Sequence, residues 1–160
     1  MDFNHFDSQG QAIMVDVSGK APTLRTAVAS ARVRMKPEIL DSILDGRVTK
    51  GDVLGVARLA GIQAAKRTHE LIPLSHPLAI HHASVEFACE RIEGTVTVEA
   101  TVRAFERTGV EMEAMVAASL AALTVYDMCK GADKGILIEE VMLLSKDGGK
   151  SGSYRRESRS

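Results

Sequence analysis

One stretch of the chain, the uncharged run from Ala114 to Tyr126, limits the possible folds more than any other. It lies between Glu113 and Asp127, and small or apolar residues occupy every side of the helix that it predicts. Its 13 residues are too few for a membrane span, which needs about 20. The run therefore predicts a core helix over 110–130, closed by Gly131 and covered on most sides.

Such a helix needs partners on several sides. One sheet in a chain of 160 residues leaves part of it uncovered, and we expect that part to pack on another subunit. A helix predicted from the cap Asp52 to about Arg67 supports this, because its surface is smooth. Its small residues are Gly55, Ala57, Ala60, Gly61, Ala64 and Ala65. The alternative is a monomer with a well-filled core.

Alternating apolar residues predict the strands. They occupy one face over 24–35, 83–90 and 96–104, with a Glu93-Gly94 turn between the last two. Pro37 begins a short helix to Leu44, a last strand covers 136–144, and a short strand is expected near 12–17. From residue 24 the order is strand, helix, strand, strand, helix, strand. This predicts an α+β fold of the ferredoxin-like split βαβ type, an antiparallel sheet with helices packed on one face. We expect one domain over 1–160, with flexible tails at 1–11 and 153–160.

Charge and cysteine content narrow the class of protein. The formal net charge is -1, whereas proteins that bind nucleic acid or anionic membranes are usually basic. Cys89 and Cys129 lie in apolar surroundings and are interpreted as thiols of a reducing compartment. The N-terminus has neither the basic nor the apolar region of a signal peptide, so we expect a cytoplasmic protein.

Charged residues at the ends of the core helix are candidates for chemistry. Asp127 and Lys130 are neighbours on one helix face, either as a surface ion pair or as an oriented proton-transfer pair. Glu113 and Asp127 point in similar directions but lie about 21 Å apart along the axis. Either one end is functional, or one end joins elements of a neighbouring subunit, or the ligand is long.

Polar residues in two connecting segments are further candidates. Lys50 precedes a helix start and Gly51, which suits a phosphate but also describes an ordinary loop lysine. Pro73 and Pro77 fix the backbone around Ser75 and His76, which either aims these side chains at a ligand or makes a rigid turn.

The sequence predicts neither a metal site nor a cofactor site. His76, His81 and His82 lack the spacing of zinc ligands on a helix. Gly149-Lys150-Ser151 is similar to the end of a phosphate-binding loop, but that motif needs glycine where Leu144 stands.

Several of these segments together resemble the cyclic pyranopterin monophosphate synthase family of molybdenum cofactor biosynthesis, from about Gln11 to Gly152. The motifs occur in order as MVDVS at 14–18, KGD at 50–52, AGIQAAKRT at 60–68, LIPLSHP at 71–77, TGVEMEA at 108–114, LTVYDMCK at 123–130 and GGKSG at 148–152. The resemblance implies a lyase that converts a cyclised GTP derivative, 3′,8-cyclo-7,8-dihydro-GTP, to cyclic pyranopterin monophosphate and pyrophosphate. It also implies a homohexamer, a trimer of dimers with each site at a dimer interface, and no bound metal.

Matching the motifs assigns roles to individual residues. Asp127 and Lys130 are implied as the catalytic pair, with Lys50 joining from the partner chain; the lysines exchange protons and Asp127 orients them. The implied substrate-binding residues are Leu74, Ser75, His76, Met112 and Glu113, with Arg25 and Lys146 as partners of the triphosphate.

Two points qualify this assignment. Ser75 stands where many relatives have cysteine, and a hydrogen-bonding or packing role survives that exchange. The alternative function is a non-catalytic, oligomeric nucleotide-binding module. Asp127 beside Lys130 argues against it, because a pure binder needs no carboxylate oriented against a lysine.

Overall fold

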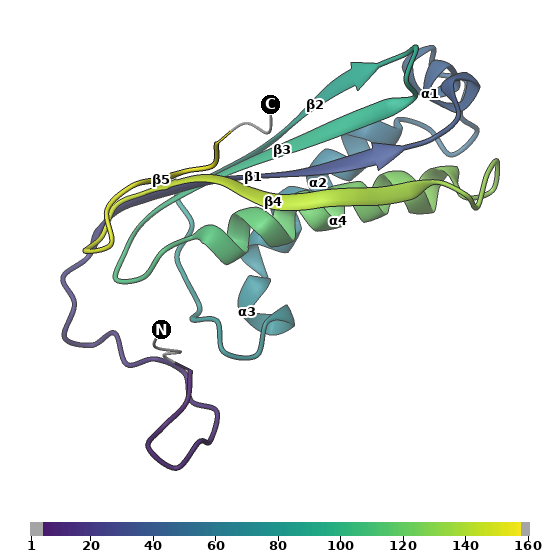
Figure 1. The fold of residues 1–160 in the computed structure, drawn as a ribbon. Helices are drawn as coiled ribbons and strands as arrows, with labels where there is room; N and C mark the ends of the chain where they lie inside the picture. Colours follow the sequence, from purple (N-terminus) through teal and green to yellow (C-terminus); the bar gives the residue numbers. More distant parts are fainter. Residues whose placement is uncertain (1–4, 158–160) are drawn as a thin grey trace.

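A computed structural model describes residues 5–157, which form an antiparallel sheet with helices on one face (Figure 1). The strands are β1 (Thr23–Arg34), β2 (His82–Glu90), β3 (Thr95–Glu106), β4 (Leu137–Asp147) and β5 (Tyr154–Arg155), in the order β2-β3-β1-β4-β5. The helices are α1 (Pro37–Leu44), α2 (Val53–Lys66), α3 (Thr68–Leu71) and α4 (Glu111–Cys129). The α+β class and the antiparallel sheet are confirmed, and the ferredoxin-like assignment remains a prediction with which the order of elements agrees.

Small residues on one face of the sheet form the core under α4. Along β1, Ala27, Ala29, Ala31 and Val33 are at most 1% exposed, as are the facing residues of β3 from Val96 to Ala104 at every second position. The two-residue period of a strand puts all of them on the helix side. The predicted apolar faces of both strands are confirmed. Because these side chains are short, α4 packs close to the centre of the sheet.

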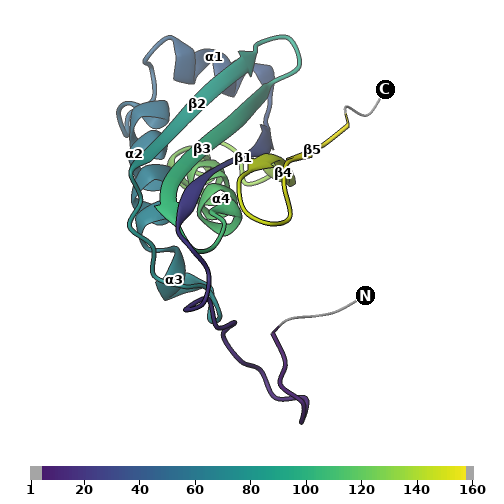
Figure 2. The ribbon, with the colours of Figure 1, turned by 90° about the vertical axis from the view of Figure 1, so that its left-hand side faces the viewer.

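Helices α2 and α4 lie side by side below the sheet (Figures 1 and 2). A Cβ added to Gly61 of α2 would lie 2.9 Å from the backbone oxygen of Ala117 in α4. Ala57 and Ala65 belong to the same buried core. The expectation that these three small residues pack against another subunit is therefore wrong, because they pack within the chain. Residue spacing alone does not show which surface a helix face made of small residues contacts.

The strand predicted near 12–17 is also wrong. Only Ala12 makes a bridge there, to Phe6, and the Asp7 carboxylate accepts bonds from the N–H groups of Gln9 and Gln11. These bonds close a local loop away from the sheet, so the alternating residues form extended chain without a strand partner. Conversely, β5 pairs with β4 where no strand was predicted. Residues 1–4 and 158–160 of the expected tails lie outside the described residues.

Helix α4 is long and apolar enough to meet the length and composition criterion of a membrane span. Core helices of soluble proteins meet the same criterion, and half of the apolar window of α4 is buried within the chain. The helix therefore serves as the core of this fold.

Valine at Gly61 should destabilise the protein by about 1–3 kcal/mol, because the added atoms have no room between α2 and α4. Denaturant unfolding at fixed protein concentration measures this. Gln63→Val, which places the same side chain at an exposed position of the same helix, is the control and should change stability by less than about 0.5 kcal/mol. Equal effects of the two variants would contradict the packing described here.

Candidate functional site

The C-terminal end of α4 holds a group that we call the lysine cluster, made of Lys50, Asp127 and Lys130. The Lys130 ammonium donates to the Asp127 carboxylate at 2.5 Å. Lys50, from the loop before α2, donates to the backbone carbonyl oxygen of Asp127 at 2.9 Å. The unpaired carbonyl groups at a helix C-terminus attract cations, which explains why both lysines gather there. All three residues predicted to be catalytic lie together.

One expectation about Lys50 needs correction. It reaches Asp127 of its own chain, so the partner chain is not required to bring it there. The start of α2 is capped as predicted by the Asp52 carboxylate, which accepts from Gly55 N–H at 2.9 Å. The sequence separation of Lys50 and Asp127 gave no indication that the fold joins them.

The lysine cluster is open to solvent in the isolated chain. The side chains of Lys130 and Asp127 are 49% and 59% exposed. The hydrogen bond from Lys130, followed by its charge and that of Lys50, lowers the pKa of Asp127; the same bond raises the pKa of Lys130. In the single chain Lys130 and Asp127 thus form a surface ion pair, and an exposed pair of this kind contributes little to stability.

The opposite end of α4 faces a cavity of about 240 Å³ that we call the Ser75–Glu113 pocket. Five of the residues predicted to bind the substrate line it, and they are Leu74, Ser75, His76, Met112 and Glu113. His76 Nε2 lies 2.7 Å from the Val15 carbonyl oxygen. Because a carbonyl only accepts, Nε2 carries hydrogen in this bond, and Nδ1 is the nitrogen left for other contacts.

Glu113 is the buried carboxyl group of this pocket, with 3% of its surface exposed. Burial raises the pKa of Glu113 to about 7, the negative charge of Glu111 adds to the rise, and a bond from its own backbone N–H opposes it. A carboxyl group with a pKa near neutrality can either donate or accept a proton under ordinary conditions.

A second cavity of about 650 Å³ adjoins the first, and we call it the Arg25–Lys146 pocket. The antiparallel register explains its position, because the start of β1 lies beside the ends of β3 and β4, with Thr23 opposite Glu106 and Thr26 opposite Asp147. Five cations from these segments line it, and they are Lys20, Arg25, Arg107, Lys146 and Lys150.

The glycine-rich segment after β4 fits closely around Arg25. Arg25 donates to the carbonyl oxygens of Glu106 and Arg107 at 3.2 and 3.3 Å. Gly149 has φ +79°, and a Cβ there would collide with the Arg25 guanidinium. Arg25 and Lys146 were predicted as substrate-binding residues, whereas Lys20, Arg107 and Lys150 line the pocket without having been predicted. Of these, only Lys150 carried a signal, within the GGKSG motif.

The pockets and the lysine cluster are separated by the length of α4. The two pockets share a wall made of Lys20, Thr108, Gly109 and Glu111. Glu113 and Asp127 are fourteen residues apart in one continuous helix, which corresponds to about 21 Å. The structure therefore gathers the predicted residues into two groups, one at each end of α4.

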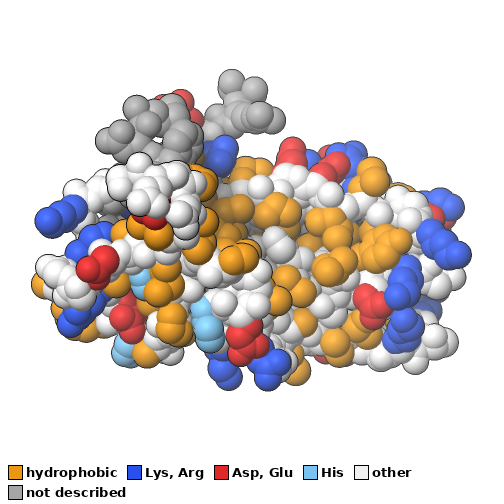
Figure 3. Space-filling view, turned by 90° about the horizontal axis from the view of Figure 1, so that it is seen from below, with side chains coloured by type: hydrophobic (Ala, Val, Ile, Leu, Met, Phe, Trp, Pro, Cys, Tyr) orange, Lys and Arg blue, Asp and Glu red, His pale blue; other side chains and the backbone are white. Residues whose placement is uncertain are grey.

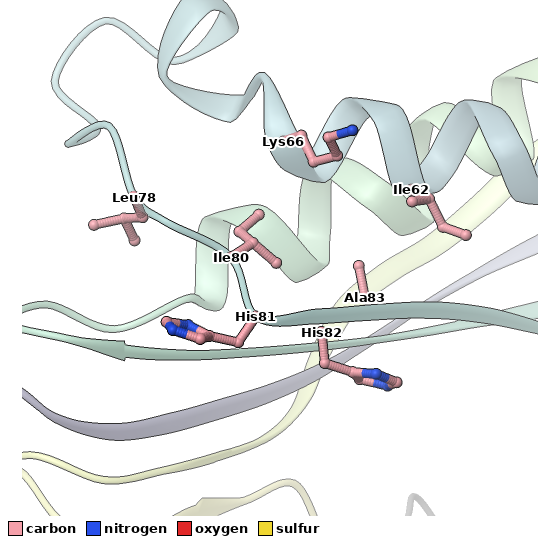
Figure 4. Close-up of a pocket in the computed structure, with 7 residues that line it drawn as sticks. All are labelled: Ile62, Lys66, Leu78, Ile80, His81, His82 and Ala83. Atoms are coloured by element: carbon pink, nitrogen blue, oxygen red, sulfur yellow. The ribbon is translucent and has the colours of Figure 1, made fainter.

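A third hollow, between α2 and β2, is a weaker candidate. Figure 4 shows Lys66 and Ile62 on the α2 side and the ring of His82 on the far side of the β2 ribbon from Lys66. The polar side chains thus do not converge on one point. Among residues 5–157, moreover, no three His, Cys, Asp or Glu side chains lie close enough to hold a metal ion.

Comparison with known proteins gives a consistent result. A family model described as the MoaC family matches residues 14–149. Proteins named cyclic pyranopterin monophosphate synthase are 78% identical in Geotalea uraniireducens and 74% identical in Geobacter metallireducens, over 157 residues and 98% of each chain. One of that name from Chloroflexus aurantiacus is 55% identical over 155 residues, 97% of this chain and 95% of the relative. The residues matched by the family model contain the lysine cluster and most of the residues that line the two pockets.

The buried Glu113 should make stability fall between pH 5 and pH 8. Its folded pKa of about 7 exceeds the ordinary value of 4.5, so its favourable contribution is complete below the ordinary value and is lost as pH rises through about 7. The shift corresponds to about 3 kcal/mol. Glu113→Gln should remove this slope in denaturant unfolding at fixed protein concentration. The exposed control Glu86→Gln should keep it, and parallel curves for wild type and Glu113→Gln would contradict the assignment.

Proposed function

The chain belongs to the MoaC family, and we propose that it is a cyclic pyranopterin monophosphate synthase whose complete active site is made by two chains. The reaction converts 3′,8-cyclo-7,8-dihydro-GTP to cyclic pyranopterin monophosphate and pyrophosphate. One observation carries the two-chain site: the catalytic candidates and the binding candidates lie at opposite ends of one rigid helix.

The Arg25–Lys146 pocket suits the triphosphate of this substrate. Five cations gather there in a chain whose formal net charge is -1, so the positive charge is local rather than general. Arginine and lysine are the residues that bind phosphate oxygens best, and the buried Arg25 is held in place by two backbone carbonyl groups. The pocket can therefore offset most of the charge of a triphosphate.

The adjoining Ser75–Glu113 pocket suits the base. Glu113 can accept hydrogen bonds from the guanidine-like edge of the purine, and its buried position makes such bonds strong. His76 is fixed through Val15 and offers its second ring nitrogen. Since both pockets share the wall at Lys20 and Glu111, one nucleotide-like ligand can extend from one into the other.

The lysine cluster supplies the acid and base groups. In this proposal Lys130 and Lys50 exchange protons with the substrate while its purine ring opens and the pterin ring closes, and Asp127 orients the lysines. A lysine in contact with bulk water is poorly suited to give up its proton at neutral pH. Closure by a neighbouring chain would remove water from Lys130 and lower its pKa.

The outer face of the helix layer supports contact with that neighbour. Figure 3 shows apolar side chains gathered along the middle of this face. The exposed large apolar residues of the two helices are Val56 and Leu59 of α2 and Met112 and Leu123 of α4. Packing two such faces would bury them, and the proposed assembly is the homohexamer, a trimer of dimers, that the family resemblance implies.

The proposed location is the cytoplasm, because Cys89 and Cys129 are free thiols of a biosynthetic enzyme. Small-molecule substrate, rather than nucleic acid or membrane, is the proposed partner, in agreement with the balanced net charge. A non-catalytic module that binds a nucleotide is the alternative, and activity of the purified protein distinguishes the two.

Lys130→Ala and Lys50→Ala should each lower product formation at least a hundredfold, because general acid–base groups typically contribute about 10²–10⁴ to the rate. Both lysines are exposed in the single chain, so the fold of the subunit should be retained. The assay measures pyrophosphate after incubation with the cyclised GTP derivative, and Lys66→Ala is the control. Full turnover by both cluster variants would overturn the catalytic role.

Subunit mixing tests the two-chain site. Lys130→Ala and His76→Ala damage opposite ends of α4, so a dimer containing one of each has one site with both defects and one intact site. Mixing them equally under subunit exchange should restore about a quarter of the wild-type activity. Lys130→Ala mixed with Lys50→Ala should restore none, because both lie in the lysine cluster. Equal results for the two mixtures would argue for sites within one chain.

A further inference from the structure

One acidic side chain stands among the cations of the Arg25–Lys146 pocket. Among the described residues that line it, Glu111 is the only carboxylate beside Lys20, Arg25, Arg107, Lys146 and Lys150. A pocket built solely to hold a polyanion would be weakened by such a group. The binding of a triphosphate therefore does not by itself explain why Glu111 lies in this pocket.

Contacts fix this carboxylate next to the cation that is expected to bind phosphate. Lys146 Nζ lies 3.6 Å from Glu111 Oε1, and it also donates to the hydroxyl of Ser151. The two side chains are only 19% and 31% exposed. On its other side the carboxylate lies against Gly109, where an added Cβ would collide with it. Glu111 is thus closely surrounded, and Lys146 is held between an acid and a hydroxyl group.

The geometry has a direct electrostatic consequence. A phosphate group that approaches Lys146 also approaches Glu111, and like charges at such distances repel each other even near a protein surface. In addition, Lys146 must exchange its existing ion pair for the phosphate. Both effects weaken the binding of every phosphate chain in this pocket, including the pyrophosphate that the reaction releases.

We propose that Glu111 is a positioning residue that holds Lys146 in the empty pocket and, through its negative charge, competes with pyrophosphate so that this product leaves. The inference rests on the proposed function, since it takes the Arg25–Lys146 pocket as the triphosphate site. Glu111 acts through Lys146, and no contact with the reacting atoms is assigned to it. It makes strong but reversible binding possible in a pocket with five cations.

The test compares the oligomeric wild-type protein with Glu111→Gln and Glu111→Asp. Calorimetry measures the binding of inorganic tripolyphosphate and pyrophosphate, and steady-state kinetics measure inhibition by added pyrophosphate. Glu86→Gln is the matched control, because Glu86 forms an ion pair of the same 3.6 Å length with Arg58 away from the pocket. Thermal unfolding of each variant checks that the fold is intact.

Glu111→Gln should bind both anions about three- to tenfold more tightly, the range expected when one partly exposed like charge is removed. Pyrophosphate should become a stronger inhibitor, and kcat and KM should both fall, because substrate and product are held more tightly. Glu111→Asp, which retains the charge, should stay near wild type, as should Glu86→Gln.

Two outcomes would overturn the inference. One is unchanged or weaker anion binding in a folded Glu111→Gln protein, which would mean that Glu111 only stabilises the first turn of α4. The other is Glu111→Asp behaving like Glu111→Gln, which would show that shape rather than charge matters. Failure of the proposed function would give a different result. The wild type would then bind no tripolyphosphate, or the Arg25→Ala variant would bind it as tightly as the wild type does.

Discussion

The stiffness and length of α4 determine what this chain can do alone. A continuous helix from Glu111 to Cys129, packed under the sheet along its whole length, cannot bend to bring its ends together. The buried Glu113 and the exposed Asp127 are therefore held about 21 Å apart. Every proposal about the site follows from this separation, because two chemically complementary groups of residues cannot meet within one subunit.

The sheet places matching groups at both ends of that helix. The start of β1 and the ends of β3 and β4 converge near Glu113 and bring cations and glycines to one cavity. At the other end, the loop before α2 brings Lys50 to the terminal carbonyl groups of α4. The pockets near Glu113 lack the paired lysines of the lysine cluster, and the cavity of about 280 Å³ beside Lys50 has no carboxylate among its lining residues. Each end supplies what the other lacks.

The helices and strands with strong apolar periodicity could be predicted from the sequence. The features that depend on which surface a segment packs against could not. The alternating faces of β1 and β3 and the core helix were correct to within about two residues, because burial acts directly on the side-chain pattern. The predicted subunit contact at Gly61 and the predicted strand near Ala12 were wrong, because residue spacing does not determine which surface a segment packs against. Lys20 and Arg107 were missed for the same reason: they join the pocket only through the register of distant strands.

The most direct measurement of the central claim is an experimental structure of the assembled protein with tripolyphosphate bound. The distance to determine runs from Lys130 Nζ of one chain to the Glu113 carboxylate of a neighbouring chain. The two-chain site predicts that at least one such distance is far shorter than the roughly 21 Å that separates the two ends of α4 within a chain. An assembly in which Lys130 faces bulk water and no neighbouring Glu113 comes closer than that would contradict it.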